Sequence, residues 1–278
     1  AAPGGWSQVT SRLIGDRAAS GTAIIEELGA RHMAEGAWIA YTSADSVFQL
    51  AAHEEVVPLE ELYRACGIAR ELCNPLRVGR IIARPFVGRP GTFRRTANRR
   101  DFSYPLPEPT ILDRLTEAGI PVTGVGKIED IFAHRGLSQS FHTGTSAASQ
   151  RQVLDLARSG AAGLIFANFI DFDMLYGHRR DVAGYARALE QTDVFFGKLL
   201  PALLPGDWLI ITADHGNDPT FSGTDHTREY VPVLAYFPGC GGQPLGIRRG
   251  FYDVAQSLAA LFGLPPMPRG VSFADSAA

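Results

Sequence analysis

The sequence predicts an α/β protein of two domains, and three observations support this. Beyond residue 110, apolar segments of strand length alternate with segments of helical periodicity. Strands that are apolar throughout and separated by helices are typical of a parallel sheet covered on both faces. Three prolines between Phe102 and Thr110 form a stiff connector. We therefore expect one domain over residues 1–104 and another over residues 105–278.

The first domain mixes helix and strand signals. Its expected elements are a helix over 23–33, a strand over 38–42, a helix from Pro58 to about Cys73 and a β-rich segment over 77–87. Ser20 and Thr22 are capping residues just before the first helix, and Pro58 favours the first turn of the second.

The second domain alternates strictly. Helices are expected over 110–118, 147–158, 181–204 and 252–262, and strands over 120–125, 163–169, 208–212 and 233–237. In such sheets the functional residues lie beyond the carboxyl ends of the strands.

Composition excludes several classes of protein. The chain has 278 residues, of which 45% are hydrophobic, and a formal charge of −3, so disorder and nucleic-acid binding are not expected. No apolar run reaches the roughly 18 residues of a membrane span. The three cysteines, Cys66, Cys73 and Cys240, are odd in number and lack CxxC spacing, which favours a reducing, cytoplasmic compartment. The sequence does not indicate an oligomeric state.

Acids and histidines follow two strands of the second domain. Asp171, Asp173 and His178 follow the strand over 163–169, and Asp214, His215 and His226 follow the strand over 208–212. Because these strands are expected to be neighbours, the side chains should converge on one rim of the sheet. Carboxylates and imidazoles together suit Mn²⁺, Zn²⁺ or Mg²⁺, and their number exceeds what one ion needs. Two divalent cations are therefore expected.

The amino-acid sequences of these segments resemble those of a known family. The strings DFDMLYGHRRD, TADHGNDP and GTDHTREYVP resemble the metal-binding segments of the alkaline phosphatase superfamily and, within it, of the phosphopentomutase family. The similarity continues upstream through SGTAIIEELG, YTSADSVFQLAAHEEVVPLEELY and GRIIARPFVG. It implies a three-layer α/β/α core with an inserted α+β cap domain. Residues 1–104 would then be an incomplete cap and residues 105–278 the C-terminal part of the core.

The resemblance also implies roles for individual residues. Asp173, His178 and His226 match the ligands of one manganese ion, and Asp214 and His215 match two ligands of the other. Asp171 is expected to be a structural carboxylate. Ser43, Asp45 and Val47 match a ribose-contacting loop, and Arg80, Ile82 and Lys127 match residues around the substrate phosphate.

The implied activity is the interconversion of ribose 1-phosphate, or its 2-deoxy analogue, with the 5-phosphate through a phosphoenzyme and a bisphosphate. The family's phosphoryl-accepting threonine and one aspartate ligand lie upstream of the cap, and no residue here matches them. We therefore expect an N-terminally truncated and inactive chain, with the catalytic nucleophile unknown. The alternatives are another superfamily enzyme, such as a phosphoglycerate mutase or a phosphohydrolase, and a non-catalytic fragment that binds sugar phosphate or metal.

Several conspicuous residues receive plainer interpretations. His32, His53, His134 and His142 have no acids clustered with them in the sequence, so they are expected to be surface or core residues. Arg179 and Arg180 could contact substrate or pair with Asp181 or Glu190, and the sequence does not distinguish these roles.

Overall fold

The computed structural model describes residues 13–42, 47–223 and 225–274. It divides into two compact units, Ala1–Pro105 and Leu106–Ala278. This division lies one residue beyond the boundary expected from the proline-rich connector. No helix among the described residues is long and apolar enough to cross a membrane.

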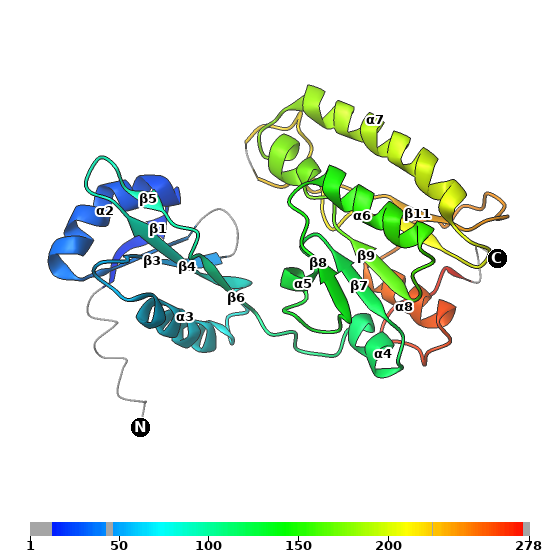
Figure 1. Cartoon of the computed structure of the whole chain (residues 1–278), viewed down its shortest axis with the longest axis horizontal. Coiled ribbons are helices and arrows are strands. Elements are labelled where there is room, and N and C mark those ends of the chain that lie inside the picture. Colours follow the sequence, from blue (N-terminus) through cyan, green and yellow to red (C-terminus); the bar gives the residue numbers. More distant parts are fainter. Residues whose placement is uncertain (1–12, 43–46, 224, 275–278) are drawn as a thin grey trace. The chain divides into compact units, whose positions relative to one another are not determined.

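The first unit is built on one mixed sheet (Figure 1). Its order is β1-β2-β3-β4-β5, and β6 also pairs with β4. The strands are β1 (Leu13–Ala18), β2 (Trp38–Thr42), β3 (Val47–His53), β4 (Arg80–Val87), β5 (Arg94–Arg95) and β6 (Arg100–Ser103). Neither β1 nor β3 was expected from the sequence. The helices are α2 (Gly21–Glu35) and α3 (Leu59–Cys73), close to the predicted bounds.

Both faces of this sheet are buried, because alternate residues of a strand point to opposite faces. Trp38 and Ala40 of β2 pack with α3, whereas Ile39 and Tyr41 pack with α2. Cys66 of α3 lies in the first of these clusters, and burial raises the pKa of its thiol to about 12. The first unit therefore has a closed core on each side of its sheet.

The second unit has two separate small sheets, so the strands over 163–169 and 208–212, which were expected to be neighbours, lie in different sheets. The strands β8 (Gln139–Phe141), β7 (Val122–Val125) and β9 (Leu164–Ala167) are all parallel, in that order. The pair β10 (Leu209–Thr212) and β11 (Val233–Tyr236) is antiparallel, so the expectation that these two strands are parallel is wrong. The described residues between them, 213–223 and 225–232, form no helix, and antiparallel neighbours need no crossover helix.

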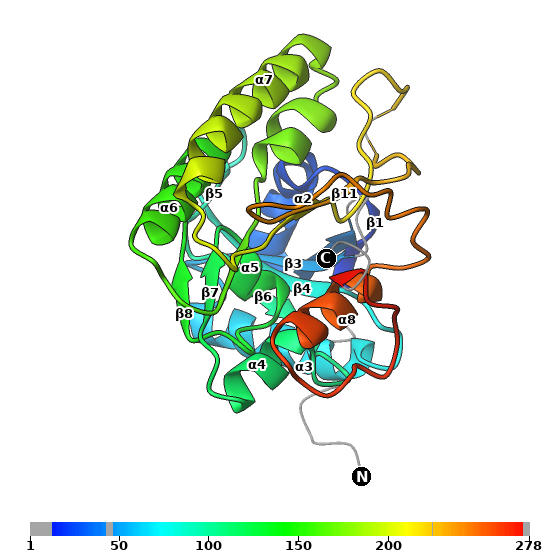
Figure 2. The same cartoon turned by 90° about the vertical axis from the view of Figure 1, so that its right-hand side faces the viewer.

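Helices cover the sheets from two sides, as the predicted three-layer core requires (Figure 2). The helices are α4 (Ile111–Glu117), α5 (Ile128–Ile131), α6 (Ser146–Arg158), α7 (Val182–Leu199) and α8 (Tyr252–Leu261), with the π-helix η1 (Phe172–Gly177) and the 3₁₀-helix η2 (Leu200–Ala202). One core cluster joins α4 and α8 to β7 and β9, and another joins α6 and α7 to β10. The helix predicted over 181–204 ends early, because Pro201 lacks a backbone donor.

Candidate metal centre

The π-helix after β9 brings Asp173 and His178 together. In an α-helix, residues five apart lie about 140° apart around the axis. A π-helix closes one turn with an i→i+5 bond, and the backbone N–H of His178 donates to the carbonyl of Asp173 (3.0 Å). The imidazole Nε2 of His178 consequently lies 3.4 Å from Asp173 Oδ1. The sequence spacing alone could not distinguish Asp173 from Asp171 as the partner of this histidine.

The loop after β10 folds back on itself and delivers His226. Gly216 and Thr227 form an antiparallel bridge, which places His215 and His226 side by side. Their rings stack with centroids 3.8 Å apart, and the His226 and His178 centroids are 4.8 Å apart. A Cβ on Gly216 would come within 2.7 Å of Thr227 O, so only glycine permits this bridge without displacement.

All five predicted ligands thus gather at one place. His226 Nε2 lies 3.2 Å from Asp173 Oδ1, and His215 Nε2 lies 3.6 Å from Asp214 Oδ2. Ligand atoms of Asp173, His215 and His226 all fall within 4.8 Å of one another. Asp214 is the most exposed of the set, with 72% of its side chain accessible.

These separations suit a divalent cation. Ligands about 2.1 Å from one ion in tetrahedral geometry stand about 3.4 Å from each other. The Oδ1 atom of Asp173 lies 3.4 Å from His178 Nε2 and 3.2 Å from His226 Nε2. Oxygen and imidazole nitrogen together are the donors that Mn²⁺ and Zn²⁺ accept. Each of the two imidazoles is therefore at a ligand–ligand distance from the Asp173 carboxylate.

Asn217 and Arg180 together fix the orientation of the Asp173 carboxylate. The buried Asn217 donates from Nδ2 to Asp173 Oδ1 (2.6 Å) and accepts from Arg180 Nη1 at Oδ1 (2.9 Å). A Cβ on Gly177 would come within 2.5 Å of this amide, so the π-helix approaches it closely. Asn217 is therefore a positioning residue for the candidate ligand.

Arg180 joins the two ligand-bearing loops. Its guanidinium donates to the carbonyl oxygens of Gly177, Asp218, Gly223 and Asp225, at distances between 2.5 and 3.1 Å. These contacts connect the end of η1 to the loop that carries His226. The sequence left open whether Arg180 contacts substrate or pairs with Asp181 or Glu190. In the structure its guanidinium acts as a clamp that holds the two loops together.

The carboxylates of Asp171 and Asp181 accept hydrogen bonds from backbone N–H groups at the starts of α6 and α7. The carboxylate of Asp171 accepts from Ser146 N (2.8 Å), and the Ser146 hydroxyl accepts from Asp171 N (2.9 Å). Asp181 accepts from Gly184 N (2.8 Å) in the first turn of α7. Asp171 is therefore engaged with the N-terminus of α6, in agreement with its expected structural role.

Lys127 lies beside this centre. It precedes α5 directly after β7, and its Nζ lies 2.9 Å from the sulfur of Met174, which follows Asp173 in the chain. Tyr185 of α7 stacks edge-on against Phe172, and burial together with the carboxylates of Asp218 and Asp173 raises the pKa of its phenol.

The other expected substrate contacts belong to the first unit. Val47 and Arg80 are direct partners in the parallel register of β3 and β4. Arg80 is exposed and lies 3.6 Å from Asp101, whereas Ile82 is buried, with 2% of its surface accessible. Ser43 and Asp45 lie outside the described residues.

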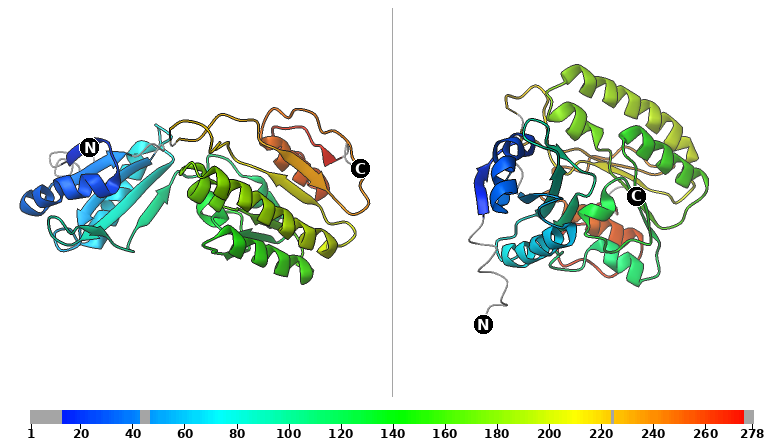
Figure 3. Two further views of the ribbon diagram at one scale, coloured as in Figure 1. Left: turned by 90° about the horizontal axis from the view of Figure 1, so that it is seen from above. Right: turned by 60° about the vertical axis from the view of Figure 1, so that its left-hand side comes forward.

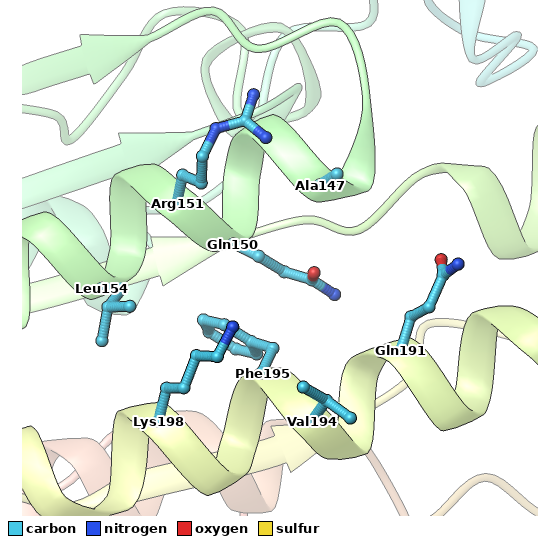
Figure 4. Close-up of a pocket in the computed structure, with 8 residues that line it drawn as sticks. All are labelled: Ala147, Gln150, Arg151, Leu154, Gln191, Val194, Phe195 and Lys198. Atoms are coloured by element: carbon cyan, nitrogen blue, oxygen red, sulfur yellow. The ribbon is translucent and has the colours of Figure 1, made fainter.

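A separate hollow lies between α6 and α7, away from the candidate ligands (Figure 4). It measures about 290 Å³, and Leu154 and Phe195 contribute apolar surface to it. Gln150 extends across it and donates to the Thr192 hydroxyl (3.0 Å). Arg151 and Lys198 contribute the charged side chains of its lining. None of the predicted site residues lines it.

The fold and the site together define an α/β metalloenzyme. Residues 109–266 match the Metalloenzyme superfamily, and the chain belongs to it. More narrowly, the chain belongs to the phosphopentomutase family. It is 56% identical over 269 residues to the phosphopentomutase of Methylobacterium sp. (strain 4-46), 53% over 268 residues to that of Caldanaerobacter subterraneus subsp. tengcongensis, and 54% over 252 residues to that of Anaeromyxobacter sp. (strain K).

The alignments cover most of this chain and less of its relatives. They include 94%, 96% and 91% of this chain, in that order, and 65%, 68% and 65% of the relatives. The chain thus spans about two thirds of the length of these curated relatives.

Proposed function

We propose that the protein to which this chain belongs is a phosphopentomutase, which interconverts ribose 1-phosphate or 2-deoxyribose 1-phosphate with the 5-phosphate. The observation that carries the proposal is that Nε2 of both His178 and His226 lies within 3.4 Å of Asp173 Oδ1, in a chain of this family. The proposed setting is cytoplasmic, with a small pentose phosphate as the partner.

Two divalent cations, Mn²⁺ by preference, are part of the proposal. Asp173, His178 and His226 would hold one, and Asp214 and His215 would contribute to the other. When bound, such a pair supplies positive charge to both the attacking and the leaving oxygen of a phosphoryl group.

The chain's own side chains have separate tasks. Asn217 and Arg180 hold the Asp173 carboxylate in one orientation. The Lys127 ammonium would bind and orient a phosphate oxygen as a compact point charge. Ser43, Asp45 and Val47 are proposed to lie at the ribose and Arg80 and Ile82 around the phosphate, with the buried Val47 and Ile82 contributing backbone atoms. The family's phosphoryl acceptor is a threonine to which no residue here corresponds, so no side chain of this chain is proposed for that step.

The test compares two forms of the protein with Mn²⁺ present. The 278-residue chain and a fusion that adds the upstream segment of the Methylobacterium relative are each given, in separate assays, ribose 1-phosphate, 2-deoxyribose 1-phosphate and 3-phosphoglycerate, and the products are followed by phosphorus NMR. We expect conversion by the fusion only. Conversion of 3-phosphoglycerate instead would favour a phosphoglycerate mutase, and a fusion that binds Mn²⁺ but converts neither sugar phosphate would refute the proposal.

A further inference from the structure

A second group of metal-ligating side chains lies at the ends of β7 and β8. Glu129 is in α5, directly after β7, and His142 is the first residue after β8. The Oε2 atom of Glu129 lies 2.8 Å from His142 Nε2, and its Oε1 atom lies 3.4 Å from His134 Nδ1. Both histidines are exposed, as expected of surface residues, but the fold brings each of them to an acid that the sequence did not associate with them.

The backbone is held in a costly conformation that directs His134 back to Glu129. Ala133 and His134 both have left-handed φ values, 51° and 61°, which non-glycine residues adopt at a cost. The amide of His134 donates to the carbonyl of Glu129 (2.9 Å), closing the turn. The chain just after this turn is closely packed against α4, because a Cβ on Gly136 would come within 2.6 Å of Leu112. This packing restricts the conformation of the turn.

A salt bridge fixes the same turn from its other side. The guanidinium of Arg135 lies 3.3 Å from Asp113 of α4 and also donates to the carbonyl of Leu106 (3.1 Å). His134 therefore projects from an anchored loop, and His142 projects from the end of a paired strand. The neighbouring imidazoles also act on the carboxylate. Burial raises its pKa, but hydrogen bonds from His134 and Ser140 and the charges of both rings outweigh this, so the pKa of Glu129 is lowered.

We propose that Glu129, His134 and His142 form a separate site for one Zn²⁺ ion. Two imidazoles and a carboxylate are a zinc ligand set, and Glu129 turns a different oxygen to each ring. The two imidazole side chains are 69% and 65% exposed, so they can rotate to meet at an ion and leave a coordination position open to water. The ion would connect α5 to the end of β8 and stabilise the turn that His134 N and Glu129 O close.

The site differs from the Asp173 centre in ligand geometry. Its two histidines contact different oxygens of one carboxylate, whereas His178 and His226 both contact Oδ1 of Asp173. Because the rings must move to converge, we expect weaker binding than at the Asp173 centre. The inference does not depend on the mutase activity, since these three residues lie outside the candidate ligand set.

The test uses two sets of variants, each of which removes one of the two candidate metal sites, and measures Zn²⁺ binding by calorimetric titration. In the His178→Ala/His215→Ala/His226→Ala background, which removes all three imidazoles of the Asp173 centre, we expect one remaining zinc equivalent. Adding His134→Ala and His142→Ala should abolish it, and adding Glu129→Gln should weaken it at least tenfold. Glu117→Gln, which removes a carboxylate from the exposed end of α4, should leave it unchanged.

The reciprocal variant completes the test. His134→Ala/His142→Ala alone should lose one zinc equivalent and keep binding at the Asp173 centre. Circular dichroism checks that each variant is folded, and the exposure of both imidazoles favours this. Zinc stoichiometry and affinity that stay the same with and without His134 and His142 would overturn the proposal.

Discussion

Polar side chains hold the fold together in both units, but among the described residues only the second unit gathers a carboxylate and imidazoles into a candidate metal centre. In the first unit, the buried polar groups hold the fold together: His32 accepts from the backbone N–H of His53 at Nε2 (2.8 Å), and its Nδ1 donates to Ala37 O (2.7 Å). In the second unit, by contrast, ligand atoms of Asp173, His215 and His226 face one another within 4.8 Å. Buried polar groups whose hydrogen bonds are all made to the fold indicate a structural role, whereas potential ligands that converge on one place indicate a functional site.

Burial differs in the same sense. Each residue of β2 from Trp38 to Tyr41 is buried, and two helices cover the sheet of the first unit from its two faces (Figure 3). In the second unit β7 is buried throughout, but β9 is only half-buried and Leu234 of β11 is 59% exposed. We therefore expect the first unit to be stable by itself, and the second to depend more on bound metal.

Removing a ligand should produce the largest effect. Asp173→Ala deletes the carboxylate that both His178 and His226 contact. Changes in the groups that merely support a ligand cost 10- to 100-fold in metal affinity, so we expect a loss on the order of 100-fold or more. Mn²⁺ titration followed by electron paramagnetic resonance measures this, with Gln191→Ala on α7 as the control. Unchanged affinity would contradict the assignment.

Metal should stabilise the two units unequally. A ligand at 100 times its dissociation constant adds about 2.7 kcal/mol to the folded state that binds it. Hydrogen exchange with and without Mn²⁺ should therefore show added protection in η1 and the loop after β10, and none in β2 to β4. Equal protection of both units would show that the comparison is wrong.

Loss of the Arg180 clamp should have an intermediate effect. Arg180→Ala removes the donors to Asn217 and to four backbone carbonyls, so Asp173 and His226 lose their common support. We expect metal affinity to fall about 10-fold to 100-fold while the helical content stays the same. Arg179→Ala, next to it in the sequence, is the matched control and should bind metal normally.

Acid should destabilise the first unit through His32. Burial lowers the pKa of this imidazole below its ordinary 6.5, and its Nε2 must stay unprotonated to accept from His53. The unfolded chain therefore binds a proton that the folded one does not, so this contribution is complete above pH 6.5 and is lost as the pH falls. The expected slope is up to about 1.4 kcal/mol per pH unit.

Denaturant unfolding between pH 7 and 5 measures that slope. His32→Gln lowers the free energy of unfolding at pH 7 but removes the titrating group, so its pH dependence should be flatter. An equally steep slope in this variant would assign the acid sensitivity to other residues.

The sequence predicted most helices, and it placed the acids and histidines of the candidate metal centre just beyond strand ends, because both depend on local patterns. It missed β3, whose apolar run over Val47–His53 follows a polar turn and carries no periodic signal. It also assigned the wrong direction to β11, since pairing direction depends on the path of the connecting loop.

Within the site, the missed features are those that depend on three-dimensional closure. The π-helix that aligns Asp173 with His178 has no sequence signature, and Arg180 binds backbone carbonyls that any residues would supply. The approach of His134 to Glu129 depends on two left-handed residues that are not glycine.

The central claim is that Asp173, His178 and His226 share one divalent ion. Anomalous diffraction from Mn²⁺-soaked crystals tests it most directly. The account predicts a manganese peak within about 2.2 Å of Asp173 Oδ1 and of Nε2 of both histidines. A peak elsewhere, or none beside Asp173 at saturating Mn²⁺, would contradict it.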